Sequence, residues 1–165
     1  RTQYDLILTT GGVSVGDYDF VRPVALKIGF EQLFWKVKQK PGKPMFFAKS
    51  ERPDQNPCYL LGLPGNPAAV YIAMQIYVST LISTVQGQKQ LPQWFSAVIS
   101  HDLKVDSRER FLRMALSFDS GVLKLSSLPK QQSHMLSNLM QAKCIVRIPA
   151  AQNIQAGQIL QGLFI

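Results

Sequence analysis

The sequence predicts an α/β fold followed by a small, mainly antiparallel β-barrel-like domain. In residues 1–88, apolar strand-like runs alternate with helix-like runs, which is the pattern of an α/β layer fold. In residues 89–165, short strand signals follow one another and are separated by turn residues. A polar stretch with Gly and Pro, QGQKQLPQ, lies between the two patterns and is interpreted as a linker. We therefore expect two domains, residues 1–88 and residues 89–165.

The first half begins with a continuous apolar run from Tyr4 to Thr9, which is typical of a strand buried in a parallel sheet. A helix is expected through FVRPVALKI, with Gly29 at its C-terminal end. Proline fits only in the first turn of a helix, so Pro23 favours an N-cap near Asp19.

Three further strand signals complete the first half. FEQLFWKVKQK and PMFFAKS are separated by the turn PGKP, and CYLLGL is a second buried strand. The tight turn GLPGNP leads from this strand into a helix that is expected to reach about Thr84.

The second half contains five strand signals and one helix signal. The strands are expected at WFSAVISH, RFLRMALSF, VLKLSSL, KCIVRIP and QILQGLF, with turns at DSG and QAG. A short helix is expected at SHMLSNLMQ.

The composition favours a globular protein with an anionic partner. An apolar content of 46% and an aromatic content of 10% argue against disorder. A formal charge of +8 favours phosphates, nucleotides, oxyanions or nucleic acid as partners, although a basic surface without a binding role gives the same charge. We expect no membrane span, because the apolar run after Pro67 is interrupted by Gln75 and by small polar residues.

The cysteines suggest a cytoplasmic protein, and the start of the sequence suggests a fragment of a longer one. Cys58 and Cys144 lie far apart in apolar strand contexts, so we expect two buried free thiols in the reducing cytoplasm, with a disulfide as the alternative. The chain opens directly in a strand without an initiator Met or a signal peptide, so we interpret it as part of a longer polypeptide.

A glycine-rich turn follows the first strand, in the stretch TTGGVSVG. Glycines let the backbone approach a ligand, and N–H groups before a helix favour an anion, so Gly11, Gly12, Ser14 and Gly16 are candidate substrate contacts. The stretch matches neither the dinucleotide-binding nor the P-loop signature. Glycines at a tight turn without any ligand remain the alternative.

Two carboxylates follow that turn directly. Mg²⁺ prefers one or two carboxylates together with substrate oxygens, so Asp17 and Asp19 are candidate metal ligands beside a phosphate. Helix capping is the alternative role for the same two residues.

Lysines cluster before and within the KPGKP loop. On one strand Lys36, Lys38 and Lys40 would point to the same side, where like charges repel and an anion would relieve the repulsion. Lys43 and Pro44 follow in the same rigid loop. A solvated charged face is the alternative interpretation.

The stretch GLPGNP is a second tight turn that, like the glycine-rich turn, follows an expected strand and precedes an expected helix. Pro64 stiffens the loop, Gly65 permits close approach, and Asn66 can cap a helix that starts at Pro67. If the two strands are neighbours, the two turns would line one crevice.

The β domain offers Arg108, Arg110 and Arg113 around an aromatic residue, and Ser133 with His134 at the start of the predicted short helix. Arginine suits phosphate or an oxyanion because its planar fork donates two parallel hydrogen bonds. Taken alone, each of these residues more often has a surface or capping role.

Taken together, TTGGVSVGDYD, FWKVKQKPGKP, GLPGNPAA and RFLR followed by QSHMLSNL resemble the molybdenum insertase family, the bacterial MoeA-type molybdopterin molybdenumtransferases and their eukaryotic relative, the gephyrin E domain. The resemblance spans nearly the whole chain. It implies the second half of a MogA-like three-layer α/β domain followed by the family's C-terminal β domain. It also implies a homodimeric full-length protein.

The resemblance further implies insertion of molybdate into adenylylated molybdopterin with release of AMP, supported by Mg²⁺. Asp19, Lys36 and Lys40 match catalytic positions of the family, and Arg113 and Ser133 match residues of the molybdate pocket. The full set of candidate substrate contacts is then Gly11, Gly12, Ser14, Gly16, Lys43, Pro44, Pro64, Gly65, Asn66, Arg113 and Ser133. Gln132 stands where many members have glycine.

Three other functions compete with this interpretation. A MogA-like molybdopterin adenylyltransferase shares the glycine-turn fold but leaves the β domain unexplained. A scaffold or binding module would carry a vestigial pocket. Nucleic-acid binding is the third alternative, but the sequence lacks the interleaved aromatic and basic residues that bind single strands. We expect the isolated chain to have little or no insertase activity, because it would hold only part of a complete site.

Overall fold

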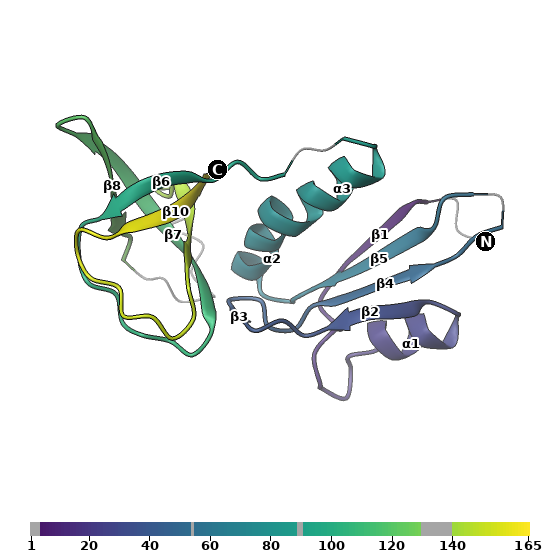
Figure 1. The fold of residues 1–165 in the computed structure, drawn as a ribbon. Coiled ribbons are helices and arrows are strands. Elements are labelled where there is room, and N and C mark those ends of the chain that lie inside the picture. The colour runs from purple at the N-terminus through teal and green to yellow at the C-terminus, as the bar shows by residue number, and fades with distance from the viewer. Residues whose placement is uncertain (1–3, 54, 89–90, 130–139) are drawn as a thin grey trace.

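The computed structural model of the chain describes residues 4–53, 55–88, 91–129 and 140–165 (Figure 1). Two sheets are present in these ranges, one of four strands and one of six. The four-stranded sheet has the order β1-β5-β4-β2, formed by β1 (Leu6–Thr10), β5 (Cys58–Leu63), β4 (Phe46–Ser50) and β2 (Glu31–Trp35). Its helices are α1 (Val21–Lys27), α2 (Pro67–Ala73), the π-helical segment η1 (Met74–Val78) and α3 (Ser79–Val85).

Helices cover both faces of the four-stranded sheet, as a three-layer α/β fold requires. Figure 1 shows α1 on one face and the α2–α3 run on the other. Side chains of β5 alternate between the two layers: Cys58 and Leu60 pack with Ala25 of α1, whereas Leu61 and Leu63 pack with the helical run. The predicted second half of a MogA-like three-layer domain is confirmed.

Strand β1 is a parallel strand, as the sequence predicted, and its partner is β5, but it is less buried than expected. Within the described chain β1 lies at the edge of the sheet, and Leu8 is 40% exposed. The continuous apolar run therefore indicated the strand correctly and its burial incorrectly. The sheet is also mixed, because β4 runs antiparallel to both β5 and β2.

Helix α1 begins later than predicted. Its N-cap is Phe20, which makes no side-chain cap, and Asp19 instead accepts a hydrogen bond from the Gly16 N–H at 2.7 Å. Pro23 does lie in the first turn, and Gly29 ends the helix with a φ of +94°, both as expected. The preceding turn, which Asp19 closes, displaces the start of the helix.

The predicted strand FEQLFWKVKQK is interrupted at Lys36, which has a φ of +67°. A left-handed residue breaks the two-residue alternation of a strand, so the lysines at 36, 38 and 40 do not share one strand face, and that prediction is wrong. The chain then forms β3 (Gln39–Lys40), which pairs in parallel with β7 (Glu109–Asp119) of the second sheet.

The second sheet closes into a five-stranded barrel. Its members are β7, β8 (Val122–Ser127), β6 (Phe95–Ile99), β10 (Ile159–Phe164) and β9 (Cys144–Ile148), and β9 pairs back onto β7. All these pairings are antiparallel except β6 with β8. The β7–β8 hairpin turns at Ser120 and Gly121, both with positive φ, which suits the right-handed twist of the strands. The predicted mainly antiparallel, barrel-like domain is confirmed.

The helical run from Pro67 to Val85 covers one face of the sheet, and its first part also reaches the barrel (Figure 1). Ile72 and Ile76 share one apolar cluster with the barrel residues Phe111 and Ile145. Contrary to the sequence-based expectation, this 19-residue run is long and apolar enough, by length and composition alone, to cross a membrane. A core helix passes the same test, and α2 and η1 contribute core side chains, whereas α3 has no buried residue. The buried side chains of the run are Ala68, Ala69, Ile72, Ala73, Ile76 and Val78.

Asn66 caps this run as predicted, with its side-chain oxygen accepting from the N–H groups of Ala68 at 3.0 Å and Ala69 at 3.4 Å. We expect Asn66→Ala to lower the free energy of unfolding by about 1 kcal/mol, because two helix N–H groups lose their acceptor. Urea unfolding measures this loss. Asn66→Asp keeps the cap and should stay within a few tenths of a kcal/mol of the wild type, roughly the scatter among good caps; an equal loss in both variants would contradict the capping role.

Cys58 and Cys144 are both free and fully buried, as expected. Burial raises the pKa of the Cys144 thiol to about 11, so it stays protonated at neutral pH and is a poor nucleophile.

Candidate functional site

The two predicted turns meet at the carboxyl ends of β1 and β5. The Gly11 N–H donates to the Leu63 carbonyl at 2.9 Å, and a Cβ built on Gly65 would lie 3.6 Å from the Gly11 Cα. Gly11 and Gly12 have φ values of +82° and +69°, a conformation that favours glycine. Two turns that are separate in sequence thus form one surface, as the sequence led us to expect.

The second turn, the KPGKP loop and one residue of the β domain line a cavity of about 320 Å³. Three of the lining side chains are cationic, Lys40, Lys43 and Arg108, and most of the remainder are proline and glycine. The complete lining is Gln39, Lys40, Pro41, Gly42, Lys43, Pro44, Pro64, Gly65, Asn66, Ala69 and Arg108. A small cavity with three cations and stiff backbone suits a compact anion.

Buried Gln39 fixes the conformation of the KPGKP loop. Its side chain is 3% exposed, donates from Nε2 to the Pro41 carbonyl at 3.1 Å and accepts a hydrogen bond from the Tyr77 hydroxyl of η1. Gly42 has a φ of +97°, and a Cβ there would lie 2.9 Å from the Gln39 amide nitrogen. Burial raises the pKa of Tyr77, so its hydroxyl stays protonated and donates. The loop is therefore held from behind by the helical layer.

Lys40 and Arg108 meet a shared counter-ion. Lys40 Nζ donates to Asp106 Oδ2 at 3.1 Å, and Arg108 donates to Asp106 Oδ1 from its backbone N–H at 3.0 Å and its Nε at 3.4 Å. These hydrogen bonds, led by that from the Arg108 backbone, lower the pKa of Asp106 to about 2. Stabilisation from this group is present above its ordinary pKa of 3.8 and is lost as the pH falls through about 2.

Lys36 lies apart from this cavity, over the indole ring of Trp35. Its Nζ is 3.9 Å from the ring centroid, and the Arg22 guanidinium is 4.3 Å from the same centroid. The indole N–H donates to the Val13 carbonyl at 2.9 Å, inside the glycine-rich turn. The structure thus places Lys36 beside the first turn and Lys40 with Lys43 beside the second.

The predicted metal ligands lie at the exposed end of the first turn. Ser14, Gly16 and Asp17 are exposed, whereas Asp19 is half-buried with one carboxylate oxygen engaged by the Gly16 N–H. No group of three or more His, Cys, Asp or Glu gathers anywhere in the described part of the chain. A site of one or two carboxylates completed by substrate oxygens needs no such group, so the magnesium site predicted at Asp17 and Asp19 stays a prediction.

Arg113 is placed differently from the other candidates. Its side chain is 2% exposed within β7, and it does not line the 320 Å³ cavity. Burial lowers the pKa of its guanidinium. Ser133, His134 and the predicted short helix as far as residue 139 lie outside the described residues, and residues 140 and 141 form a turn.

Gln39, Pro41, Gly42 and Ala69 line the cavity but were not candidates from the sequence, and Arg108 was only one of three arginines considered. The signal for Gln39 was its alternation with lysines, which put it on the face opposite to them. The sequence could not single out Arg108, because its place beside the KPGKP loop depends on the pairing of β3 with β7.

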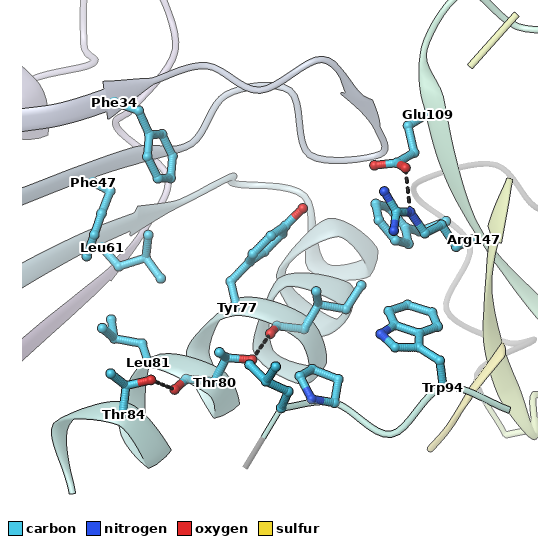
Figure 2. A pocket seen from close by; sticks show the side chains of 14 residues that line it. Phe34, Phe47, Leu61, Tyr77, Thr80, Leu81, Thr84, Trp94, Glu109 and Arg147 are labelled. Atoms are coloured by element: carbon cyan, nitrogen blue, oxygen red, sulfur yellow. Dashed lines mark hydrogen bonds and ion pairs between the residues drawn. The ribbon is translucent and has the colours of Figure 1, made fainter. Parts of the chain in front are cut away.

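A second and larger cavity, of about 620 Å³, lies between the four-stranded sheet and the barrel, and its lining is shown in Figure 2. The polar groups on its wall are already engaged: Arg147 pairs with Glu109 at 2.5 Å, and the Thr80 and Thr84 hydroxyls donate to carbonyls of their own helical run. Phe34, Phe47, Trp94 and other apolar residues form the rest. The described lining of this cavity is therefore mainly apolar and contains one ion pair, in contrast to the three cations of the 320 Å³ cavity.

Comparison with known proteins defines the class of protein to which this site belongs. Residues 1–84 match the family described as "probable molybdopterin binding domain", and residues 96–163 match the "MoeA C-terminal region (domain IV)". The chain belongs to the molybdopterin-binding domain family and carries a MoeA-type C-terminal domain. The predicted resemblance to a MoeA-type protein is confirmed.

Individual relatives agree with this assignment. The chain is 35% identical to a molybdopterin molybdenumtransferase of Haemophilus influenzae, over 96% of this chain and 39% of that protein. It is 33% identical to the molybdenum cofactor synthesis protein cinnamon of Drosophila melanogaster, over 88% of this chain and 24% of that protein. A crystal structure of the molybdopterin biosynthesis MoeA protein of Pyrococcus horikoshii shares the fold, with a TM-score of 0.66 at 18% identity, over 98% of this chain and 35% of that one. The chain thus spans about two fifths of its bacterial relative.

Proposed function

We propose that the full-length protein acts in molybdenum cofactor biosynthesis and inserts molybdate into adenylylated molybdopterin with release of AMP. The observation that carries this proposal is the 320 Å³ cavity, where cationic side chains of both domains face two stiff loops. The names of the relatives support a transferase of this pathway. We propose the homodimer on the resemblance alone, and the cytoplasmic location on the two free, buried cysteines.

The contribution of Arg108 favours an insertase over an adenylyltransferase of the MogA type. Arg108 belongs to the segment just before β7 and lines the cavity together with the KPGKP loop. An adenylyltransferase that lacked the β domain would lack this cation. A pure scaffold would have no need of a buried glutamine that shapes a cationic cavity.

The residues of the cavity support charge stabilisation rather than covalent catalysis. Lys40, Lys43 and Arg108 would hold the oxyanion and offset negative charge that develops as the phosphoanhydride breaks. The GLPGNP turn would form a rigid wall on one side of the bound anion, because Asn66 caps α2 and Pro67 begins it. Such a wall would keep water away from that side of the anion. Lys36 and Arg22, beside the first turn, would face the phosphate groups of the pterin substrate.

We also propose a magnesium ion at Asp17 and Asp19. When bound, Mg²⁺ would neutralise phosphate oxygens and help the adenylate to leave. Asp19 would keep the turn closed through its bond to Gly16, and its second oxygen remains available for the ion.

Substitution of the cavity lysines tests the proposal. We expect Lys40→Ala and Lys43→Ala, each in the full-length protein, to lower AMP release from adenylylated molybdopterin roughly 10²-fold or more, because each removes a cation beside the reacting anion. Lys38→Ala is the matched control, since Lys38 is an exposed lysine of the same segment outside the cavity. Equal activity in all three variants and the wild type would refute an insertase site here, as would full rescue of a cofactor-deficient strain by Lys43→Ala.

A further inference from the structure

The contact between the two halves of the molecule includes one acidic side chain at the cationic cavity, Asp106. It comes from the segment before β7 and reaches Lys40 of β3 at 3.1 Å, while its other oxygen accepts from Arg108. Its side chain is 16% exposed, whereas those of Lys40 and Arg108 are 53% and 37% exposed. Asp106 therefore lies behind the cavity wall and holds two of the three cations that line it.

The third cation differs from the other two. Across the residues that the structure describes, no ion pair within 4.0 Å involves Lys43. Asp106 does not itself line the cavity. The three cations and the one carboxylate thus leave a net charge of +2 at the cavity rather than +3.

We propose that Asp106 is a resident counter-ion, which a bound oxyanion displaces from Lys40, and that this exchange sets the affinity of the cavity for anions. The proposal rests on the anion site of the proposed function and extends it to a residue that tunes the site. In the ligand-free protein Asp106 keeps Lys40 and Arg108 from repelling each other. When an anion binds, Lys40 turns toward the anion, and the carboxylate keeps its two contacts with Arg108.

The direction in which anion affinity changes when Asp106 loses its charge separates a counter-ion role from a purely structural one. If Asp106 only held the loop in place, its removal would disorder the cavity and weaken anion binding. If it competes with the anion, removal of its charge strengthens binding, because a negative charge close behind the wall repels a second one. Even at a separation of about 9 Å and a dielectric close to that of water, the repulsion corresponds to about a fivefold change in affinity for a divalent anion.

The test measures binding of sulfate and of molybdate to the full-length protein by calorimetry at low ionic strength. Asp106→Asn, which keeps the shape and loses the charge, should bind both anions about fivefold more tightly than the wild type. Asp106→Glu keeps the charge and should bind them like the wild type. The matched control is Asp119→Asn, since Asp119 is paired with Lys124 at the β7–β8 hairpin, outside the residues of the cavity, and its loss should change nothing.

The outcomes distinguish the proposal from the function on which it rests. Unchanged or weaker binding by Asp106→Asn, together with wild-type binding that Lys43→Ala abolishes, would overturn the counter-ion role and leave the anion site intact. Wild-type protein that binds neither anion would overturn both. If Asp106→Asn does not fold, Asp106→Ser removes the same charge and carries the same expectation.

Discussion

Gln39→Leu is expected to lower the free energy of unfolding by about 1–3 kcal/mol and to weaken anion binding at the 320 Å³ cavity. Leucine has a similar size but cannot accept the hydrogen bond of the Tyr77 hydroxyl or donate to the Pro41 carbonyl. The buried hydroxyl would then lack its partner, which costs more than the hydrogen bond itself contributed. Loss of the contact to Pro41 would also release the loop that carries Lys40 and Lys43.

Urea unfolding and sulfate binding measure the two effects. Tyr77→Phe in the same protein removes the stranded hydroxyl, so the double variant should recover most of the lost stability without recovering the affinity. Gln161→Leu is a suitable control, because Gln161 is an exposed glutamine of β10 whose side chain donates to Ser96, away from the cavity. A double variant no more stable than Gln39→Leu alone would show that the Tyr77 contact is not the source of the loss.

The sequence correctly predicted those parts of the fold that are determined by interactions between residues close in the chain. Asn66 before Pro67 marked the helix start, and the pattern around Ser120 and Gly121 marked a hairpin; both are confirmed because the deciding interactions span only a few residues. The place of Lys36 could not be predicted in this way. Its positive φ follows from long-range contacts, among them the hydrogen bond from its N–H to the Met45 carbonyl at 2.8 Å.

The candidate site shows the same division between local and long-range signals. The glycine and proline turns were identified from their composition, and the pairing of β1 with β5 brings them together. The choice among the arginines was not determined by composition. Arg108, Arg110 and Arg113 look alike in sequence, but β7 buries Arg113, while the β3–β7 pairing brings Arg108 to the KPGKP loop. Which arginine lines a cavity is a property of the packing between the two halves.

Gly62 in β5 is the position where a single added methyl group is expected to do the most damage to the first turn. A Cβ built there would lie 2.4 Å from Val13 Cγ1 and 3.4 Å from Phe46 Cβ. Val13 is 2% exposed and belongs to the glycine-rich turn, so it cannot move without shifting the turn. We expect Gly62→Ala to lower the free energy of unfolding by about 1–3 kcal/mol, as overpacking of a filled core does.

Rescue by a compensating substitution makes this prediction specific to the contact between Gly62 and the first turn. Val13→Ala removes the Cγ1 atom that meets the new methyl group, so Gly62→Ala combined with Val13→Ala should be more stable than the sum of the two single losses predicts. Gly65→Ala provides the comparison, because its Cβ would meet the Gly11 Cα at an ordinary 3.6 Å and should cost less. Urea unfolding measures the three variants. If the loss of stability in the double variant equals the sum of the two single losses, Val13 does not resist the added methyl group and the prediction is wrong.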